Sequence, residues 1–188
     1  MTTLTAPTTI TPEQLERIPD NQSMELVDGV IVEKEGSTIS SQFEASILFA
    51  LQQFDASRRL AAIFSASLGY RCFGDAPDRI RKPDVSVIRI ERFKALTDPN
   101  PGYMPIIPDL AVEVISTNDT VTDVDEKILE YRAAGFPLIW VVDPVVRQVT
   151  VYPNPGKPYL LTEEDEIRCE NALPGFVSKV GDLFPPAI

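Results

Sequence analysis

The segment 109–116, with the sequence DLAVEVIS, decides the fold because it combines the apolar run of a buried strand with an acid at its centre. Side chains alternate along a strand, so Leu110, Val112 and Val114 share one face and Glu113 points to the other. An ionised carboxylate in a core is costly unless it is paired or bound to a metal ion. Glu113 therefore either belongs to a site or lies on a half-exposed face and points to solvent.

A second acid, Asp84, begins another predicted strand in the segment 82–88, KPDVSVI. A proline followed by an acid more commonly marks a turn that precedes a strand. However, an acid at the head of one strand and an acid inside its neighbour can bring carboxylate oxygens to one magnesium ion. Mg²⁺ prefers oxygen ligands and keeps several waters, so two carboxylates and a substrate phosphate are enough. Asp84 and Glu113 are thus the candidate metal ligands.

The helix predicted over residues 123–134 carries a third candidate, Lys127. Lys127 and Tyr131 lie four residues apart and share one face of this helix. Because the helix follows the strand that carries Glu113, an ammonium on it could reach the edge where the acids meet. In the alternative, Lys127 belongs to the solvated helix face and pairs with acids of its own helix.

The rest of the sequence predicts the elements around these segments. Asp28-Gly29 predicts a hairpin over 24–35, and apolar residues at three- and four-residue spacing predict a helix over 40–56. The helix 123–134 is expected to be capped within 116–118 and to end at Gly135. Further expected elements are a helix from Thr11-Pro12, a short helix near 92–96, strands at 61–73, 83–90, 137–144 and 147–154, and short strands in the C-terminal tail. This order predicts an α/β (α+β) fold, a mixed sheet flanked by helices with N-terminal and C-terminal hairpins.

Length and composition predict one domain over 11–188, preceded by a flexible polar tail over 1–10. The tail lacks the pattern of a signal peptide, and the apolar runs are too short to span a bilayer. Cys72 and Cys169 form neither a disulfide framework nor a zinc cluster, and we expect both to be reduced. A cytoplasmic protein without membrane association is expected.

Charge and composition exclude several classes of catalytic and binding site. The chain has no histidine, which excludes histidine-dependent triads, histidine-ligated zinc and imidazole bases. Acidic residues outnumber basic ones 28 to 17, for a net charge of -11, which argues against DNA affinity driven by a broadly basic surface. A local basic strip of Arg79, Arg81 and Lys82 nevertheless lies beside Asp84.

Asp84, Glu113 and Lys127, in this order and spacing, resemble the PD-(D/E)xK nuclease superfamily. More closely, the chain is similar to the Uma-type family of putative restriction endonucleases, which is numerous in cyanobacteria. The matching segments, which cover about residues 23–152, are ELVDGVIVE, RKPDVSVI, PDLAVEVIS, DVDEKILEYRAAG and PLIWVVDP. The resemblance implies a restriction-endonuclease-like core and an endonuclease that hydrolyses DNA phosphodiester bonds with Mg²⁺ or Mn²⁺.

The resemblance also implies a role for each site residue. Asp84 and Glu113 would hold the metal ion, and Lys127 would position a water or stabilise the transition state. The additional candidates are Glu25 and Glu44 as further ligands, Tyr131 beside Lys127, and Arg81 and Lys82 as phosphate contacts or, alternatively, members of a solvated loop.

Two departures from the family pattern affect the expected activity. Ile115 stands where the usual motif has a lysine, and Ser41-Gln42 stands where relatives often carry a histidine. These departures and the acidic charge keep a second function open, a weakly active or inactive module that acts in binding or dimeric assembly. A homodimer is expected of an active form too, since cutting two strands needs two sites related by symmetry. A small-molecule hydrolase that uses the same carboxylates is a third alternative.

Overall fold

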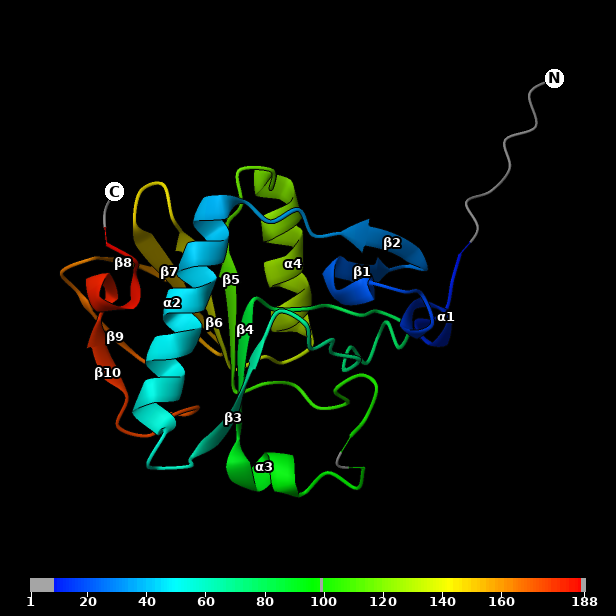
Figure 1. Cartoon of the computed structure of the whole chain (residues 1–188), viewed down its shortest axis with the longest axis horizontal. Helices are drawn as coiled ribbons and strands as arrows, with labels where there is room; N and C mark the ends of the chain where they lie inside the picture. Colours follow the sequence, from blue (N-terminus) through cyan, green and yellow to red (C-terminus); the bar gives the residue numbers. More distant parts are fainter. Residues whose placement is uncertain (1–8, 99, 187–188) are drawn as a thin grey trace.

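A computed structural model describes residues 9–98 and 100–186 and contains a mixed six-stranded sheet (Figure 1). Its strand order is β3-β4-β5-β6-β7-β8. The strands are β3 (Ala61–Ser65), β4 (Val85–Arg89), β5 (Leu110–Val114), β6 (Leu138–Asp143), β7 (Gln148–Pro153) and β8 (Tyr159–Thr162). β5 pairs with β6 in parallel, and the other neighbours in this sheet are antiparallel. The predicted mixed sheet with a central apolar strand is therefore confirmed.

Two hairpins flank this sheet, as the sequence predicts. The N-terminal hairpin joins β1 (Met24–Val27) to β2 (Val30–Glu33), and β9 (Glu166–Arg168) pairs with β10 (Val177–Lys179) near the C-terminus. Asp28 and Gly29 both have positive φ, at 51° and 80°, which matches the twist of a tight two-residue turn. The turn fixes the register of β1 against β2 and so decides which side chains point toward the sheet.

Three of the described helices begin after a residue whose side chain accepts a backbone N–H of the first turn. The helices are α1 (Pro12–Glu16), α2 (Thr38–Asp55), α3 (Ile90–Lys94) and α4 (Val121–Ala133), with short 3₁₀ helices η1 (Asn21–Ser23) and η2 (Val180–Leu183). The cap of α4 is Thr120, whose hydroxyl accepts a hydrogen bond from the backbone N–H of Asp123, so the cap predicted within 116–118 is wrong. Ser116 instead donates its hydroxyl to the carbonyl of Glu35. Gly135, with a φ of 89°, follows the end of α4 as predicted.

The strand predicted over 61–73 is too long, because β3 ends at Ser65. The chain turns there and then passes Gly69, where an added Cβ would lie 2.7 Å from a ring carbon of Tyr103. Beyond the turn, the backbone N–H of Tyr70 donates to the carbonyl of Arg81 instead of continuing the pairing of β3 with β4. Tertiary contacts therefore override the local strand preference of this segment.

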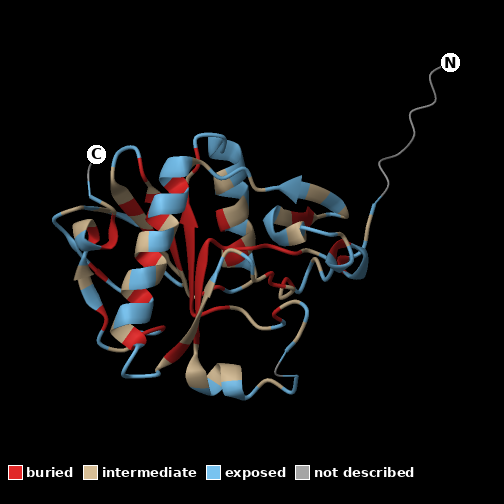
Figure 2. Ribbon diagram, viewed as in Figure 1, coloured by how far each residue is buried: buried red, intermediate tan, exposed pale blue. Residues whose placement is uncertain are grey.

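The two faces of the sheet carry separate apolar cores, and α2 and α4 cover opposite faces (Figures 1 and 2). The α2 side contains Phe43, Ile47, Leu51, Val85, Val87, Leu110, Val112, Val114, Trp140 and Val142. The α4 side contains Ala111, Ile128, Tyr131, Phe136, Ile139 and Val141. The alternation predicted for β5 is thus confirmed, and it places Glu113 on the α4 side.

A third, smaller core closes the N-terminal part of the chain. Leu15, Leu26 and Ile80 are fully buried there, and Ile10 packs against them. Ile10 also donates its backbone N–H to the carbonyl of Gly29, so packed structure already includes the last residue of the expected 1–10 tail. Residues 1–8 of that expected tail lie outside the described residues. Within the described ranges, no helix combines the length and apolarity needed to cross a membrane.

Leu110→Ala should lower the free energy of unfolding by about 3 kcal/mol, because the fully buried Leu110 leaves a cavity in the central strand. Leu129→Ala, which removes the same atoms from a side chain that is 66% exposed, should cost less than about 0.5 kcal/mol. Urea titration of both variants measures the difference. Equal losses would contradict the placement of β5 in the core.

Candidate functional site

The antiparallel pairing of β4 and β5 brings Asp84 beside Glu113. The backbone N–H of Asp84 donates to the carbonyl of Val112, at 2.9 Å. Its carboxylate Oδ2 in turn accepts the backbone N–H of Val114, at 2.6 Å. Asp84 thus continues the hydrogen-bond ladder of the sheet with its side chain, and this fixes its carboxylate at the end of β5.

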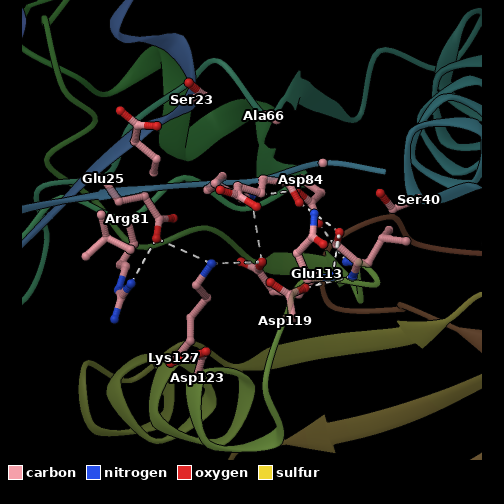
Figure 3. Close-up of a pocket in the computed structure, with 18 of the residues that line it drawn as sticks. Ser23, Glu25, Ser40, Ala66, Arg81, Asp84, Glu113, Asp119, Asp123 and Lys127 are labelled. Atoms are coloured by element: carbon pink, nitrogen blue, oxygen red, sulfur yellow. Dashed lines mark hydrogen bonds and ion pairs between the residues drawn. The ribbon is translucent and has the colours of Figure 1, made fainter. Parts of the chain in front are cut away.

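Glu113 is buried, with only 8% of its surface exposed, so it does not simply point to solvent. Its two oxygens have different partners from α4. The Tyr131 hydroxyl donates to Oε1 at 2.7 Å, and the Lys127 ammonium lies 3.3 Å from Oε2. The four-residue spacing of Lys127 and Tyr131 places both on the helix face that packs against β5. Figure 3 shows Lys127 rising from α4 toward these carboxylates.

Glu25 of β1 joins the same group from the N-terminal hairpin. Its side chain is 1% exposed, and its Oε2 lies 3.4 Å from the Lys127 ammonium. Oε2 also accepts a hydrogen bond from Arg81 at 2.8 Å, while Oε1 accepts the backbone N–H of Lys82 at 2.7 Å. Lys127 therefore pairs with Glu25 and Glu113. The alternative interpretation, in which it pairs with acids of its own helix, is wrong.

Lys34, which follows β2, is a site residue that the sequence analysis missed. Its ammonium lies 2.5 Å from Asp84 Oδ1 and 3.8 Å from Glu113 Oε2, and it donates to the carbonyl of Lys82 at 2.7 Å. The hairpin register contains a signal for it. The backbone N–H of Lys34 donates to the carbonyl of Ser23, so Lys34 lies two pairs along from Glu25, on the same face of the hairpin.

These contacts form one alternating ion-pair chain across the site. In order, its members are Asp84, Lys34, Glu113, Lys127, Glu25, Arg81 and Glu130. They come from β1, the end of β2, the approach to β4, β5 and α4. Each buried acid in the chain faces at least one cation, which makes the burial of so many charges tolerable.

A polar cleft of about 540 Å³ lies over this chain. The lining includes Asp84, Lys34, Glu113, Lys127, Glu25 and Arg81 from the chain, together with Glu44 and Ser41 of α2. Glu44 is half-buried, and burial together with the carboxylates of Asp84 and Glu113 raises its pKa to about 7, although Lys34 opposes the rise. Glu44 is therefore a cleft residue and not a surface acid of the helix start.

Arg81 and Lys82 have different surroundings from those expected of phosphate contacts. Both are buried, so neither lies on a solvated loop. The guanidinium of Arg81 donates to Glu25 and, through two nitrogens, to Glu130. The ammonium of Lys82 donates to the backbone carbonyls of Asn21 and Gln22. Both cations are thus engaged by protein groups. Arg81 lines the cleft, whereas Lys82 does not, so the geometry gives no support to a phosphate role for Lys82.

The electrostatics of the site differ between its two ends. Burial raises the pKa of Glu113, the carboxylates of Asp84 and Glu25 add to the rise, and Lys127 and Lys34 only partly oppose it. Burial also acts on Glu25, but Lys127, Lys34 and Arg81 together outweigh it and lower its pKa. An additional positive charge nearby would therefore stabilise the ionised form of Glu113 more than that of Glu25, which already has enough cations around it.

The donor set of the site suits a hard divalent cation. Asp84, Glu113 and the carbonyl of Lys82 place three oxygens around one cation, the Lys34 ammonium. Oxygen donors are those that Mg²⁺ and Mn²⁺ prefer. In the ranges that the structure describes, no three or more acidic, cysteine or histidine side chains are grouped so as to hold a metal ion. The described residues therefore fit a metal ion held by two carboxylates, with water or substrate oxygens as its remaining ligands.

Comparison with protein families settles the relationship of the chain. The model of the Uma2 family, described as "putative restriction endonuclease", matches residues 12–181. The chain belongs to the Uma2 family. The crystal structure of a putative nuclease from Anabaena variabilis is 22% identical to the chain, with a TM-score of 0.78 over 93% of this chain and 97% of that one. This likeness supports the nuclease-like fold. A comparison with curated proteins gives no match.

Membership of the Uma2 family confirms the predicted resemblance, and the structure locates the two departures from its pattern. Ile115 packs among apolar residues on the α4 side of the sheet, so the position of the usual lysine is filled by an apolar side chain. Ser41 and Gln42 are both exposed, and of the two only Ser41 lines the cleft. The ammonium groups near the acids come instead from Lys34 and Lys127.

Arg81→Met should lower the free energy of unfolding by about 3 kcal/mol, because it leaves the buried carboxylate of Glu25 with one cation fewer. Arg168→Met removes a guanidinium that is 60% exposed and paired with the exposed Glu166, and should cost less than about 0.5 kcal/mol. Denaturant titration of the two variants compares them. Similar small losses would mean that Arg81 contributes no more than a surface pair.

Glu44→Gln should flatten the dependence of stability on pH. A carboxyl with a pKa near 7 in the folded protein and an ordinary value of 4.5 binds more protons when folded. Its contribution to stability is therefore greatest below 4.5 and falls as the pH rises toward 7. Thermal unfolding between these pH values, with chelator present, should show a shallower decline for Glu44→Gln. Asp75→Asn, which changes an exposed acid of a turn outside the cleft lining, is the control and should leave the wild-type decline in place.

Proposed function

We propose that this Uma2-family protein is a metal-dependent endonuclease that hydrolyses phosphodiester bonds in DNA with Mg²⁺ or Mn²⁺. The observation that carries the proposal is the convergence of Asp84, Glu113 and Lys127 at one polar cleft. Asp84 and Glu113 are the residues that would hold the divalent ion. When bound, such an ion polarises a phosphoryl oxygen and lowers the pKa of a coordinated water.

The protein's own groups have distinct tasks in this reaction. Tyr131 donates to Glu113 Oε1 and so orients the carboxylate, while Glu25 holds Lys127 from its other side. Lys127 faces the cleft and offers positive charge to the phosphoryl group as charge builds on its oxygens. Glu44, with a pKa of about 7, can accept or release a proton near neutral pH and is the candidate acid-base group.

An acidic chain must hold DNA through a local surface, because its net charge of -11 repels the polyanion. The cations that line the cleft are Lys34, Lys127 and Arg81. Because Glu25 and Glu130 hold the guanidinium of Arg81, Lys34 and Lys127 are the ones that we assign to this contact. Double-strand cleavage also requires two sites that face the two strands, so we extend the proposal to a homodimer.

Asp84→Asn should abolish Mn²⁺-dependent nicking of supercoiled plasmid, with a loss of at least about a hundredfold, because the metal pair loses one charge. The amide oxygen can still accept the Val114 N–H, so circular dichroism should show a folded variant. Asp75→Asn, which changes an exposed acid in a turn, is the matched control and should cut as fast as the wild type. Cleavage that survives in Asp84→Asn, and in Asp84→Ala, would point to a contaminating nuclease.

A non-catalytic binding or assembly module is the second candidate function. Two observations favour it, the apolar Ile115 at the position of the usual lysine and the acidic net charge. Calorimetry with Mn²⁺ separates the two functions when it is combined with the nicking assay. Metal binding that depends on Asp84 and Glu113 without any cleavage would assign the chain to the second candidate.

A further inference from the structure

Lys34 makes contacts that are unusual for a lysine beside a hairpin. Its side chain is only 20% exposed, and its ammonium is surrounded by Asp84 Oδ1 at 2.5 Å, Glu113 Oε2 at 3.8 Å and the carbonyl of Lys82 at 2.7 Å. Burial disfavours its charge, yet the carboxylates of Glu113, Asp84 and Glu25 outweigh burial and raise its pKa. Lys34 therefore stays charged while it is held against the two acids.

The backbone on both sides of Lys34 is fixed, so the contact is built into the fold. The Lys34 N–H donates to the carbonyl of Ser23 across the hairpin, at 2.8 Å. The carbonyl of the next residue, Glu35, accepts the hydroxyl of Ser116, at 2.7 Å. Ser116 lies just beyond β5, so the strand that carries Glu113 also anchors the segment that carries Lys34.

The oxygens that Lys34 uses are those that the proposed function assigns to a divalent ion, and this inference rests on that assignment. Both cations need Asp84 and Glu113. A divalent ion within a few ångströms of the ammonium meets strong repulsion, because charges this close and partly buried are poorly screened. The Lys34 ammonium and a divalent ion therefore cannot both lie against Asp84 and Glu113 without this repulsion.

Of the two ammonium groups at the site, Lys34 is the one that can leave. Lys127 lies inside the alternating ion-pair chain, between Glu113 and Glu25. Both ammonium groups line the cleft of about 540 Å³, but Lys34 lies next to the end of that chain, beyond which only Asp84 follows. A flexible lysine stem can swing its ammonium from Asp84 into this cleft without disturbing the buried pairs of Glu25.

We propose that Lys34 is a tethered cation that competes with a divalent metal ion for Asp84 and Glu113, and that metal binding displaces its ammonium into the cleft. Metal affinity is then set by this chain's own lysine as well as by its two acids. Lys34 acts as a positioning residue for the acids in the metal-free protein.

Calorimetry with Mn²⁺ on the full chain tests the competition. Lys34→Met keeps the length of the side chain and removes its charge, so its affinity for Mn²⁺ should exceed that of the wild type by at least about tenfold. Lys179→Met, which removes an exposed ammonium paired with Glu164, is the control and should match the wild type. Circular dichroism confirms that both variants are folded.

A second measurement uses the wild-type protein and does not depend on any variant. The rate at which an amine-acetylating reagent modifies Lys34, read by mass spectrometry, should rise several-fold when Mn²⁺ is added, because a displaced ammonium loses its carboxylate partners. Lys179 provides the internal reference, and its rate should not change.

The outcomes separate this inference from the proposed function. Competition is supported if Lys34→Met binds Mn²⁺ more tightly than the wild type and Mn²⁺ also accelerates the acetylation of Lys34 in the wild type. It is likewise supported if Lys34→Met binds Mn²⁺ and the wild type does not. If the wild type binds Mn²⁺ but Lys34→Met binds no tighter, or if acetylation of Lys34 does not accelerate, the competition is overturned and the metal site stands. If neither protein binds Mn²⁺, both the metal site and the competition fail.

Discussion

The burial of Glu113 in the central strand is the constraint on which the rest of the site depends. A carboxylate on the α4 side of β5 requires cations, and the fold supplies them from segments distant in sequence. The crossover helix α4 between the parallel strands brings Lys127 and Tyr131, and the N-terminal hairpin brings Lys34 and Glu25. The hairpin is therefore part of the site, because without it Asp84 and Glu113 would lose Lys34, which contacts both of them.

The parts of this arrangement that follow from local periodicity could be predicted from the sequence. Strand alternation predicts the face of Glu113, and helix spacing predicts that Lys127 and Tyr131 point together. The hairpin at Asp28-Gly29 follows from the preference of a tight turn for positive φ. In each of these cases the determining interaction lies within a few residues along the chain, so the sequence contains the answer.

The parts that depend on tertiary contacts could not be predicted in the same way. The strand beginning at Ala61 ends early because Gly69 passes against the ring of Tyr103, more than thirty positions later in the sequence. The basic strip at Arg81 and Lys82 is indistinguishable in sequence from a solvated loop, and only packing reveals its buried partners. The register of the hairpin predicts that Lys34 shares a face with Glu25. To place Lys34 in the site, however, one must also know that the hairpin packs against the sheet.

The dual use of Asp84 has a consequence for how relatives of this chain are interpreted. Its carboxylate serves as the acceptor that a backbone carbonyl would otherwise provide, since it receives the Val114 N–H at the end of β5. Loss of this side-chain oxygen would therefore leave a buried donor without a partner, at a cost to folding that has nothing to do with catalysis. Selection for a stable sheet alone would keep an oxygen acceptor here, aspartate or asparagine, in a lineage that had given up cleavage. An aspartate at this position in a homologue is therefore not by itself a sign of enzymatic activity.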